Sequence, residues 1–170
     1  MTNIGLLSDT HGYIDERIIS HLEDCDEIWH AGDIGDIELA QKLESLKPLK
    51  AVYGNIDGTK LRMSFPEDLV FECEKLKVFI THIGGYPGNY PSKLKNKIQE
   101  LKPDLFICGH SHILKVMPDK INKLLHMNPG AAGKHGFHKI RTLLKFSVNG
   151  KKIENVRVVE LGQRGEIENV

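Results

Sequence analysis

The chain has 170 residues, of which 40% are hydrophobic, and this is enough for one domain to bury a substantial core. Its 23 Lys and Arg residues balance 23 Asp and Glu residues, so the net charge is zero. No broad cationic field is then available to bind the phosphates of a nucleic acid. We therefore expect a single domain over residues 1–170 and no stable nucleic-acid binding.

The N-terminal segment and the cysteines indicate where such a chain would work. Asp9 interrupts the first apolar run too early for a signal peptide, and no apolar stretch is long enough to span a bilayer. Cys25, Cys73 and Cys108 are odd in number and far apart, which favours reduced thiols over a disulfide framework or a zinc finger. We expect a cytoplasmic protein with no membrane attachment.

Strands and helices alternate in the first third of the chain. A strand is predicted at residues 4–7, and Ile14, Ile18 and Leu22 then recur at every fourth position on one face of a helix. A second strand at 27–31 precedes a helix that Asp36 could cap, and a third strand begins at 50–53. This succession predicts parallel strands joined by right-handed crossovers.

The middle and end of the chain are richer in strand. Strands are predicted at 69–71 and 78–81, followed by a helix that begins near Pro91 and ends at Lys102, and by a strand at 105–108. Residues 142–148 and 153–161 are predicted to form a hairpin through Asn149-Gly150, which readily adopts positive φ. We expect these strands to build a second, largely antiparallel sheet, with a polar, loosely held tail at 162–170.

Residues that commonly bind metals follow the predicted strands at one end. Five of them each follow a predicted strand, and two more stand two positions beyond the first and the last; the set is Asp9, His11, Asp33, Asn55, His82, His110 and His112. A single histidine is more often structural, but the same pattern beside glycines at five strand ends is not expected from independent structural roles. Because active sites gather where strands end, the sequence predicts a metal site at one edge of a sheet.

The chemistry of this set narrows the choice of metal. Carboxylate, amide and imidazole groups without thiolate favour Mn, Fe, Co, Ni or Zn. Seven ligands exceed the need of one tetrahedral ion, whereas two ions about 3.5 to 4 Å apart that share a carboxylate would use all of them. After Asp9, Asp33 and a bridging hydroxide are counted, such a centre keeps a charge of about +1, which suits an anionic ester. The hydroxide would serve as nucleophile, so no side-chain nucleophile is required.

The order of these motifs resembles a known family. Asp9-x-His11, Gly32-Asp33, Gly54-Asn55, Thr81-His82 and Gly109-His110-Ser111-His112 are similar to the motifs of the calcineurin-like metallophosphoesterases. Gly54-Asn55-x-Asp57, Asn128-Pro129-Gly130 and the short chain resemble the YfcE-like phosphodiesterase branch, and the likeness covers residues 4–161. It implies an α/β fold (α+β by some schemes) of two packed mixed β-sheets flanked by helices, the four-layer αββα metallophosphoesterase sandwich.

The resemblance also assigns roles. One metal would be held by Asp9, His11, Asp33 and His112, and the other by Asn55, His82 and His110, with Asp33 as the bridge. Asp33, Asn55 and His82 would be catalytic, and a metal-bridging hydroxide would attack a small phosphodiester. Manganese is the expected metal, with nickel, iron, cobalt and zinc as alternatives. Family members often self-associate, so a homo-oligomer is one expected state.

Two positions depart from the family pattern. Many larger members carry a histidine directly after the asparagine, where it is thought to protonate the leaving group or steady the phosphate. This chain has Ile56 there, and Asp57 lacks that partner. We therefore expect a preference for diesters with good leaving groups. The second departure is Ala131, which stands where a serine often follows Asn-Pro-Gly.

Substrate contacts are expected from Asp57, Tyr86, Lys134 and His135. The last two lie in segment 133–138, which either reaches over the metal centre or forms a solvated loop, and Tyr86 lies in a glycine-rich stretch that is either a mobile rim or a turn. Arg141 either pairs with an internal carboxylate or reaches the phosphate. His21, His30 and His126 are interpreted as structural.

Two other functions compete with the phosphodiesterase. One is a phosphomonoesterase, and the other is a non-catalytic protein-binding scaffold of the retromer-subunit type, a relative thought to have lost part of its metal site. All seven positions hold competent ligands here, which favours an enzyme.

Overall fold

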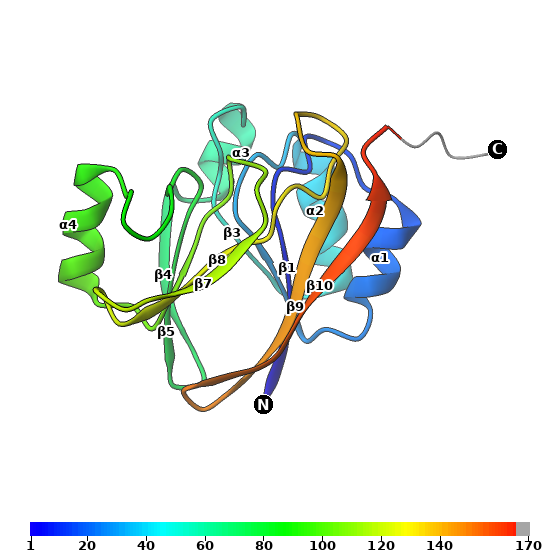
Figure 1. Cartoon of the computed structure of the whole chain (residues 1–170). Helices are drawn as coiled ribbons and strands as arrows, with labels where there is room; N and C mark the ends of the chain where they lie inside the picture. Colours follow the sequence, from blue (N-terminus) through cyan, green and yellow to red (C-terminus); the bar gives the residue numbers. More distant parts are fainter. Residues whose placement is uncertain (166–170) are drawn as a thin grey trace.

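The first of two five-stranded β-sheets contains both ends of the described chain. The computed structural model describes residues 1–165 (Figure 1). The strands of this sheet follow the order β10-β9-β1-β2-β3. Their bounds are Thr2–Leu7 for β1, Glu27–His30 for β2, Leu49–Ala51 for β3, Ile140–Asn149 for β9 and Lys152–Gln163 for β10. β1, β2 and β3 are parallel, as the alternation of strands and helices predicted, while β9 runs antiparallel to β1 and β10.

The second sheet is mixed, with the order β4-β5-β6-β8-β7. Its strands are Asp68–Cys73 for β4, Leu76–Thr81 for β5, Leu105–Ile107 for β6, Lys115–Asp119 for β7 and Leu124–Asn128 for β8. The outer pairs β4–β5 and β7–β8 are antiparallel, and the inner pairs β5–β6 and β6–β8 are parallel.

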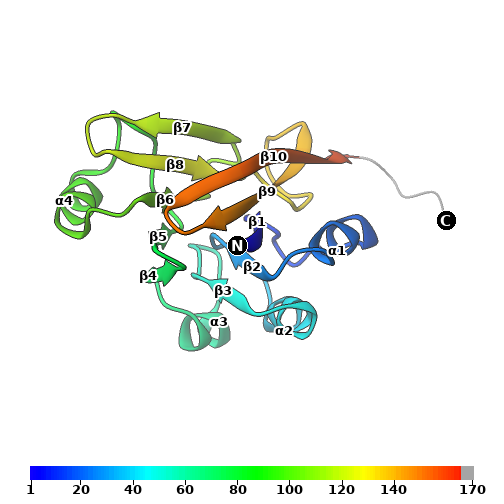
Figure 2. The same ribbon diagram turned by 90° about the horizontal axis from the view of Figure 1, so that it is seen from below.

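Helices cover the outer faces of both sheets. They are α1 (Glu16–Leu22), α2 (Ile37–Leu46), α3 (Thr59–Ser64) and α4 (Ser92–Leu101). In Figure 2, α1 and α2 lie beside the first sheet, and α4 lies on the far side of the second. Asp15 and Asp36 cap α1 and α2 by accepting the N–H groups of Ile18 and Leu39. The four-layer sandwich of two mixed sheets with flanking helices is thereby confirmed.

Side-chain alternation along the strands builds the layers. On β5, Val78 and Ile80 point into the core between the sheets, whereas Phe79 between them packs under α4. β6 repeats the pattern, because Phe106 joins Phe79 and its neighbours Leu105 and Ile107 face the other sheet. Each strand is therefore apolar on both faces, which explains why these segments read as continuous apolar runs.

Three details differ from the sequence-based expectation. The hairpin predicted around Asn149-Gly150 exists, but it extends the first sheet through β1, and the second sheet is evenly mixed rather than largely antiparallel. Helix α3 and strands β7 and β8 were not predicted. Strand β10 continues to Gln163, so the expected tail begins later than Gly162; residues 166–170 lie outside the described part of the chain.

Within residues 1–165, no helix is long and apolar enough to cross a membrane.

Candidate metal centre

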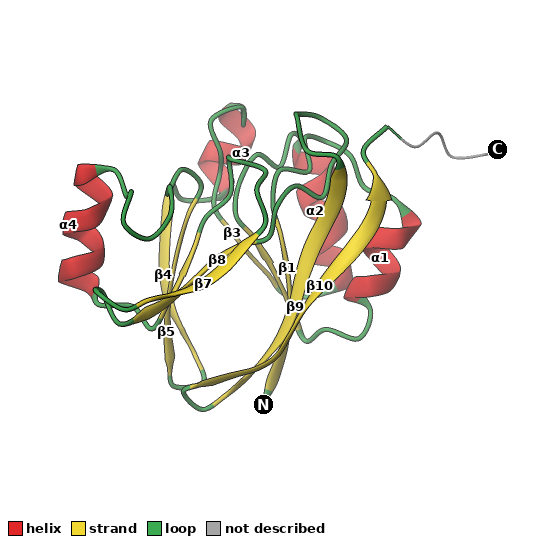
Figure 3. Cartoon of the chain, viewed as in Figure 1, coloured by secondary structure: helices red, strands yellow, loops and turns green. Residues whose placement is uncertain are grey.

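The predicted metal ligands lie where β1, β2, β3, β5 and β6 end. Figure 3 shows the loops after these strands gathered at one end of the sandwich, where the two sheets diverge. Both sheets supply ligands, because Asp9, Asp33 and Asn55 follow strands of the first sheet, whereas His82 and His110 follow strands of the second. The tertiary structure thus brings together residues that are up to about 100 positions apart in the sequence.

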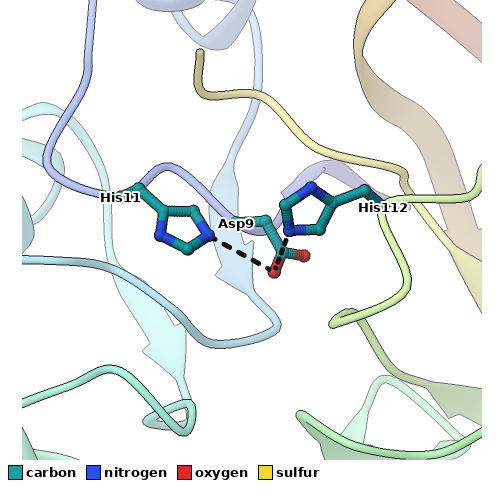
Figure 4. A group of neighbouring side chains, drawn as sticks. All are labelled: Asp9, His11 and His112. Carbon is teal, nitrogen blue, oxygen red and sulfur yellow. Dashed lines mark ion pairs between the residues drawn. The ribbon is translucent and has the colours of Figure 1, made fainter. Parts of the chain in front are cut away.

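Six of the seven side chains form two clusters that could each hold a metal ion. The first consists of Asp9, His11 and His112, and the second of Asp33, His82 and His110; within each cluster the ligand atoms lie within 4.8 Å of one another. Figure 4 shows the first cluster, in which both imidazoles point at the carboxylate of Asp9. The Nε2 atom of His112 lies 3.2 Å from Asp9 Oδ1, and that of His11 lies 4.0 Å from it.

Asp33 stands between the two clusters. Its Oδ2 is 3.6 Å from His11 Nε2 in the first cluster, and its Oδ1 is 3.3 Å from His82 Nε2 in the second. Asn55 joins the second cluster, since its Oδ1 lies 3.1 Å from the same nitrogen of His82. One carboxylate that offers an oxygen to each cluster is the arrangement of a bridging ligand.

Two buried atoms in the first cluster have no hydrogen-bond partner among the described residues. They are Asp9 Oδ1 and His11 Nε2. A buried carboxylate oxygen without a donor is costly, and a cation beside it removes that cost. The unpartnered atoms, together with oxygen and imidazole groups and no thiolate, fit a divalent transition metal.

The backbone at the centre is strained at five of the seven ligands. Asp9, His11, Asp33, His110 and His112 all have positive φ, between 48° and 67°. This left-handed region is sparsely populated by residues with side chains, and it costs on the order of 1 kcal/mol per residue. Such strain persists only where the surroundings impose it, and here it turns successive ligands toward one point.

Two glycines make room for the ligands. A Cβ on Gly54 would lie 2.0 Å from Asp33 Oδ1, so any side chain there would displace the Asp33 carboxylate. Gly32 has a φ of 95°, and a Cβ on it would lie 2.6 Å from the ring of His82. The glycines that precede Asp33 and Asn55 in the sequence motifs thus reflect close packing around the ligands.

Backbone hydrogen bonds orient the ligands further. His82 donates its Nδ1–H to the carbonyl of Ala31 at 2.8 Å, which leaves Nε2 unprotonated and facing the second cluster in the neutral ring. The N–H of Ile56 donates to Asp33 Oδ1 at 3.1 Å, and the N–H of His110 donates to Asp9 Oδ2 at 3.1 Å.

His30 holds the first two ligand loops together. The N–H of Gly32 donates to His30 Nδ1, so Nε2 carries the proton and donates to Thr10 Oγ1 at 2.9 Å. The Thr10 hydroxyl in turn donates to the carbonyl of Ile34 at 2.9 Å. Burial lowers the pKa of His30 to about 4, so the ring is neutral at neutral pH. Its interpretation as a structural histidine agrees with this geometry.

His138 performs a similar task for His112. The carbonyl of Gly133 accepts a hydrogen bond from His138 Nε2 at 2.9 Å, which places the proton of the neutral ring on that nitrogen. The other nitrogen, Nδ1, then accepts from His112 Nδ1–H at 3.2 Å. The Nε2 of His112 is left unprotonated and faces Asp9. The sequence offered only the nearby glycines and histidines of segment 133–138 as a signal for this contact.

The electrostatic balance favours the ionised form of the Asp33 carboxylate. Burial lowers the pKa of His11, and the nearby Asp33 and Asp9 oppose the shift only in part. Burial also acts against the charged form of His82, but Asp33 and Asp9 outweigh it and raise the pKa of that ring. For Asp33, burial is outweighed by the hydrogen bond with His82 and by the N–H of Ile56, and its pKa falls below the ordinary value. Asp33 is therefore ionised at neutral pH, the form that binds metals.

Comparison with known proteins assigns the chain to a family. The model of the calcineurin-like phosphoesterase superfamily domain matches residues 2–151. The chain belongs to this superfamily. A protein of Methanothermobacter thermautotrophicus named as a probable metallophosphoesterase is 31% identical over 133 residues, which cover 75% of this chain and 76% of that protein.

Solved structures share the phosphoesterase fold. An archaeal phosphodiesterase superposes with a TM-score of 0.74 at 26% identity, over 94% of this chain and 99% of that one. A zinc complex of Vps29 from Entamoeba histolytica superposes with a TM-score of 0.72 at 16% identity, over 96% of this chain and 99% of that one. The family is metal-dependent, and the two clusters offer candidate metal ligands in this chain.

Asp57 is buried beside the loops of the candidate metal centre and is not exposed to a substrate. Its carboxylate accepts the N–H groups of Ile34, Gly35 and Gly54 at 2.7 to 3.1 Å. These bonds join the loop after β2 to the loop after β3, which carry Asp33 and Asn55. We propose that Asp57 positions these loops, in place of the substrate contact that the sequence suggested.

Of the other expected substrate contacts, His135 and Tyr86 lie beside the candidate metal centre. The ring of His135 lies 4.8 Å from that of His11, so segment 133–138 does reach the first cluster. Lys134 Nζ lies 4.6 Å from the ring centroid of Tyr13. Tyr86 is exposed and lines a cavity beside His110.

Arg141, by contrast, is buried and pairs with an internal carboxylate. Its guanidinium donates to Asp15 Oδ2 at 2.8 Å and to the carbonyl of Ala132 at 2.9 Å, which is the first of the two roles that the sequence left open.

Proposed function

We propose that this protein is a dinuclear metal-dependent phosphodiesterase that hydrolyses a small phosphodiester. The single observation that carries the proposal is the position of Asp33, whose two oxygens face one histidine of each cluster at 3.6 and 3.3 Å. A protein that needed one structural ion would not require a second cluster around a shared carboxylate.

The two clusters suggest how the ions would be divided. One ion would be held by Asp9, His11, Asp33 and His112, and the other by Asn55, His82, His110 and the shared Asp33. Two divalent ions held there would activate a water at neutral pH and offset the charge that develops on the phosphoryl oxygens. Carboxylate and amide oxygens suit manganese, the metal that we propose, and the imidazoles suit the alternatives nickel, iron, cobalt and zinc as well.

The chain's own residues would fix the ligand forms and the reaction geometry. The bonds from His82 to Ala31 and from His112 to His138 keep an unprotonated nitrogen toward each cluster. Asn55, exposed at the opening beside His82, would orient a phosphoryl oxygen. Ile56 has no group that can give a proton, so the leaving oxygen would depend on solvent or on its own stability as an anion.

A direct test is the hydrolysis of bis(p-nitrophenyl) phosphate by metal-free protein to which Mn, Ni, Co or Zn is added. We expect turnover that depends on metal and that is lost in Asp33→Ala but kept in His21→Ala, an exposed histidine of α1. p-Nitrophenyl phosphate should be hydrolysed more slowly, whereas a faster rate would favour the phosphomonoesterase alternative. If no metal supports turnover of either ester, the enzyme proposal is wrong and the non-catalytic, protein-binding scaffold becomes the better interpretation.

The absence of a proton donor at Ile56 gives a second test. Rates measured for a series of aryl and alkyl diesters should fall steeply as the pKa of the leaving alcohol rises. A flat dependence would show that some group of the protein protonates the leaving oxygen.

A further inference from the structure

A cavity of about 370 Å³ opens beside the second metal-ligand cluster. Its wall includes Gly109, His110 and Ser111, the loop that carries one of the proposed ligands. The volume lies at the lower end of the range for small-molecule sites, about 300 to 1,000 Å³. It exceeds what a phosphate group alone requires, so the cavity has space for a substituent of the phosphate.

Large apolar side chains line the cavity while still exposed to solvent. Ile83, Tyr86 and Ile113 retain 50%, 45% and 61% of their accessible surface. They come from the loops after β5 and β6, so the same loops that deliver His82 and His110 also deliver this apolar surface. Contiguous exposed apolar surface next to an active site marks a place where a ligand is bound.

The polar groups of the cavity suit an aromatic ligand. Lys115 places its ammonium 4.3 Å from the ring centroid of Tyr86, so a cation and an aromatic face already meet in the wall. His126 also lies in the wall, fully buried, and neither of its ring nitrogens has a hydrogen-bond partner among the described residues. Its ring centroid lies 5.6 Å from that of Phe106 and 6.0 Å from that of Tyr90.

We propose that this cavity binds an aromatic substituent of the phosphoester, with the phosphate at the metal centre. The inference deepens the proposed function and rests on it for the position of the phosphate. An aromatic ring would bury the exposed surface of Ile83, Tyr86 and Ile113 and would meet the Lys115 ammonium. A simple aryl group and a nucleobase both present such a ring. The shared chemistry is therefore a planar aromatic group, from either a simple aryl ester or a nucleotide.

The proposal is tested by measuring the affinities of phosphomonoesters for the metal-loaded full chain by calorimetry. The ligands are methyl, n-butyl and phenyl phosphate and thymidine 5′-monophosphate, which share the phosphate and differ in the substituent. We expect phenyl phosphate to bind at least tenfold more tightly than methyl phosphate, with n-butyl phosphate clearly weaker than phenyl. Tighter binding of thymidine monophosphate than of phenyl phosphate would identify a nucleotide as the source of the ring, and the reverse order a simple aryl ester.

A pair of variants distinguishes an effect of the cavity on ligand affinity from the effect of replacing any exposed isoleucine. Ile113→Ser should reduce the preference for phenyl over methyl phosphate at least threefold. Ile121→Ser, an exposed isoleucine in the turn between β7 and β8, should leave that preference unchanged.

Three results would overturn the proposal: equal affinities of phenyl and methyl phosphate, equal affinities of phenyl and n-butyl phosphate, or an unchanged preference in Ile113→Ser. Because calorimetry does not require turnover, the two proposals fail separately. Diester hydrolysis without a preference for aromatic ligands would overturn only the proposal that the cavity binds an aromatic group. A preference for aromatic ligands without any hydrolysis would overturn only the proposal that the protein is a phosphodiesterase.

Discussion

Replacing His138 by leucine should weaken the metal bound by Asp9, His11 and His112 and leave the second metal nearly unchanged. Among the proposed ligands, His138 contacts His112, through a hydrogen bond of 3.2 Å between the two Nδ1 atoms and through edge-to-face packing of the rings, whose centroids lie 5.1 Å apart. In the absence of that acceptor, the proton of His112 is free to move to Nε2, the nitrogen that faces the cluster. The variant would therefore lose part of its population to a tautomer that cannot bind metal.

The expected loss follows from what a supporting hydrogen bond contributes. Removing such a partner of a metal ligand lowers metal affinity by about 10- to 100-fold, which is about 1.4 to 2.7 kcal/mol. Burial lowers the pKa of His138, so at neutral pH the ring is neutral and able to accept the bond in the wild-type protein. The variant also leaves the Gly133 carbonyl without its donor, but this does not act on a ligand directly.

Metal titration by calorimetry, with manganese added to metal-free protein, resolves the two affinities. His138→Gln provides the matched comparison, because its amide oxygen can accept from His112 while its NH₂ group donates to Gly133, and it should restore most of the lost affinity. At saturating metal, kcat for bis(p-nitrophenyl) phosphate should return close to the wild-type value in both variants.

Three outcomes would refute this reasoning. Unchanged affinity in His138→Leu would show that His112 keeps its tautomer without help. Equal weakening of both metals would indicate a general loss of structure, and the same loss in His138→Gln would show that the hydrogen bond is not the cause.

Three further predictions follow from the same structure. Asp33→Ala should abolish binding of both metals in a calorimetric titration, whereas His112→Ala should weaken chiefly one; equal loss in both variants would contradict the proposed division. Asp57→Ala leaves three N–H groups without this acceptor, two of them buried and that of Gly35 partly buried, and should lower the free energy of unfolding in urea by roughly 2 to 4 kcal/mol; unchanged stability would contradict a positioning role. Burial lowers the pKa of His126 from 6.5 to about 4, so the unfolded chain takes up this proton first as the pH falls. Stability should thus decline between about pH 6.5 and 4, by up to about 3 kcal/mol from this residue, and His126→Phe should lose less over that range.

The sequence predicted the elements in which a local pattern is long enough to be read. β1, β2 and the helices around Ile18 and Leu43 follow from apolar periodicity, and the second helix also from its capping residue, Asp36; both signals act over a few neighbouring residues. Helix α3 was not predicted, because six residues are too few to show a helical period. Strand β7 was not predicted, because Pro118 argues against a strand. The sheet tolerates this proline because β7 is an edge strand.

The site divides in the same way. The seven proposed metal ligands could be named from the sequence because each stands in a short motif at the end of a strand, and the strand itself fixes where that end lies. The residues that orient these ligands and their loops, His138 and Asp57, could not be identified from the sequence. The bond from His112 to His138 spans 26 positions, and the bonds from Ile34 and Gly35 to Asp57 span 23 and 22.

The sequence also did not predict which sheet the β9–β10 hairpin joins. A hairpin is encoded by its own turn, Asn149-Gly150, but its partner is β1, more than 130 positions away. By itself, the sequence determined which residues could bind metal and where each stands along the chain, because turn preference, apolar period and ligand chemistry are local properties. Only the tertiary structure decided which side chains orient the ligands and that an apolar cavity adjoins them, because these depend on the packing of segments that no local pattern relates.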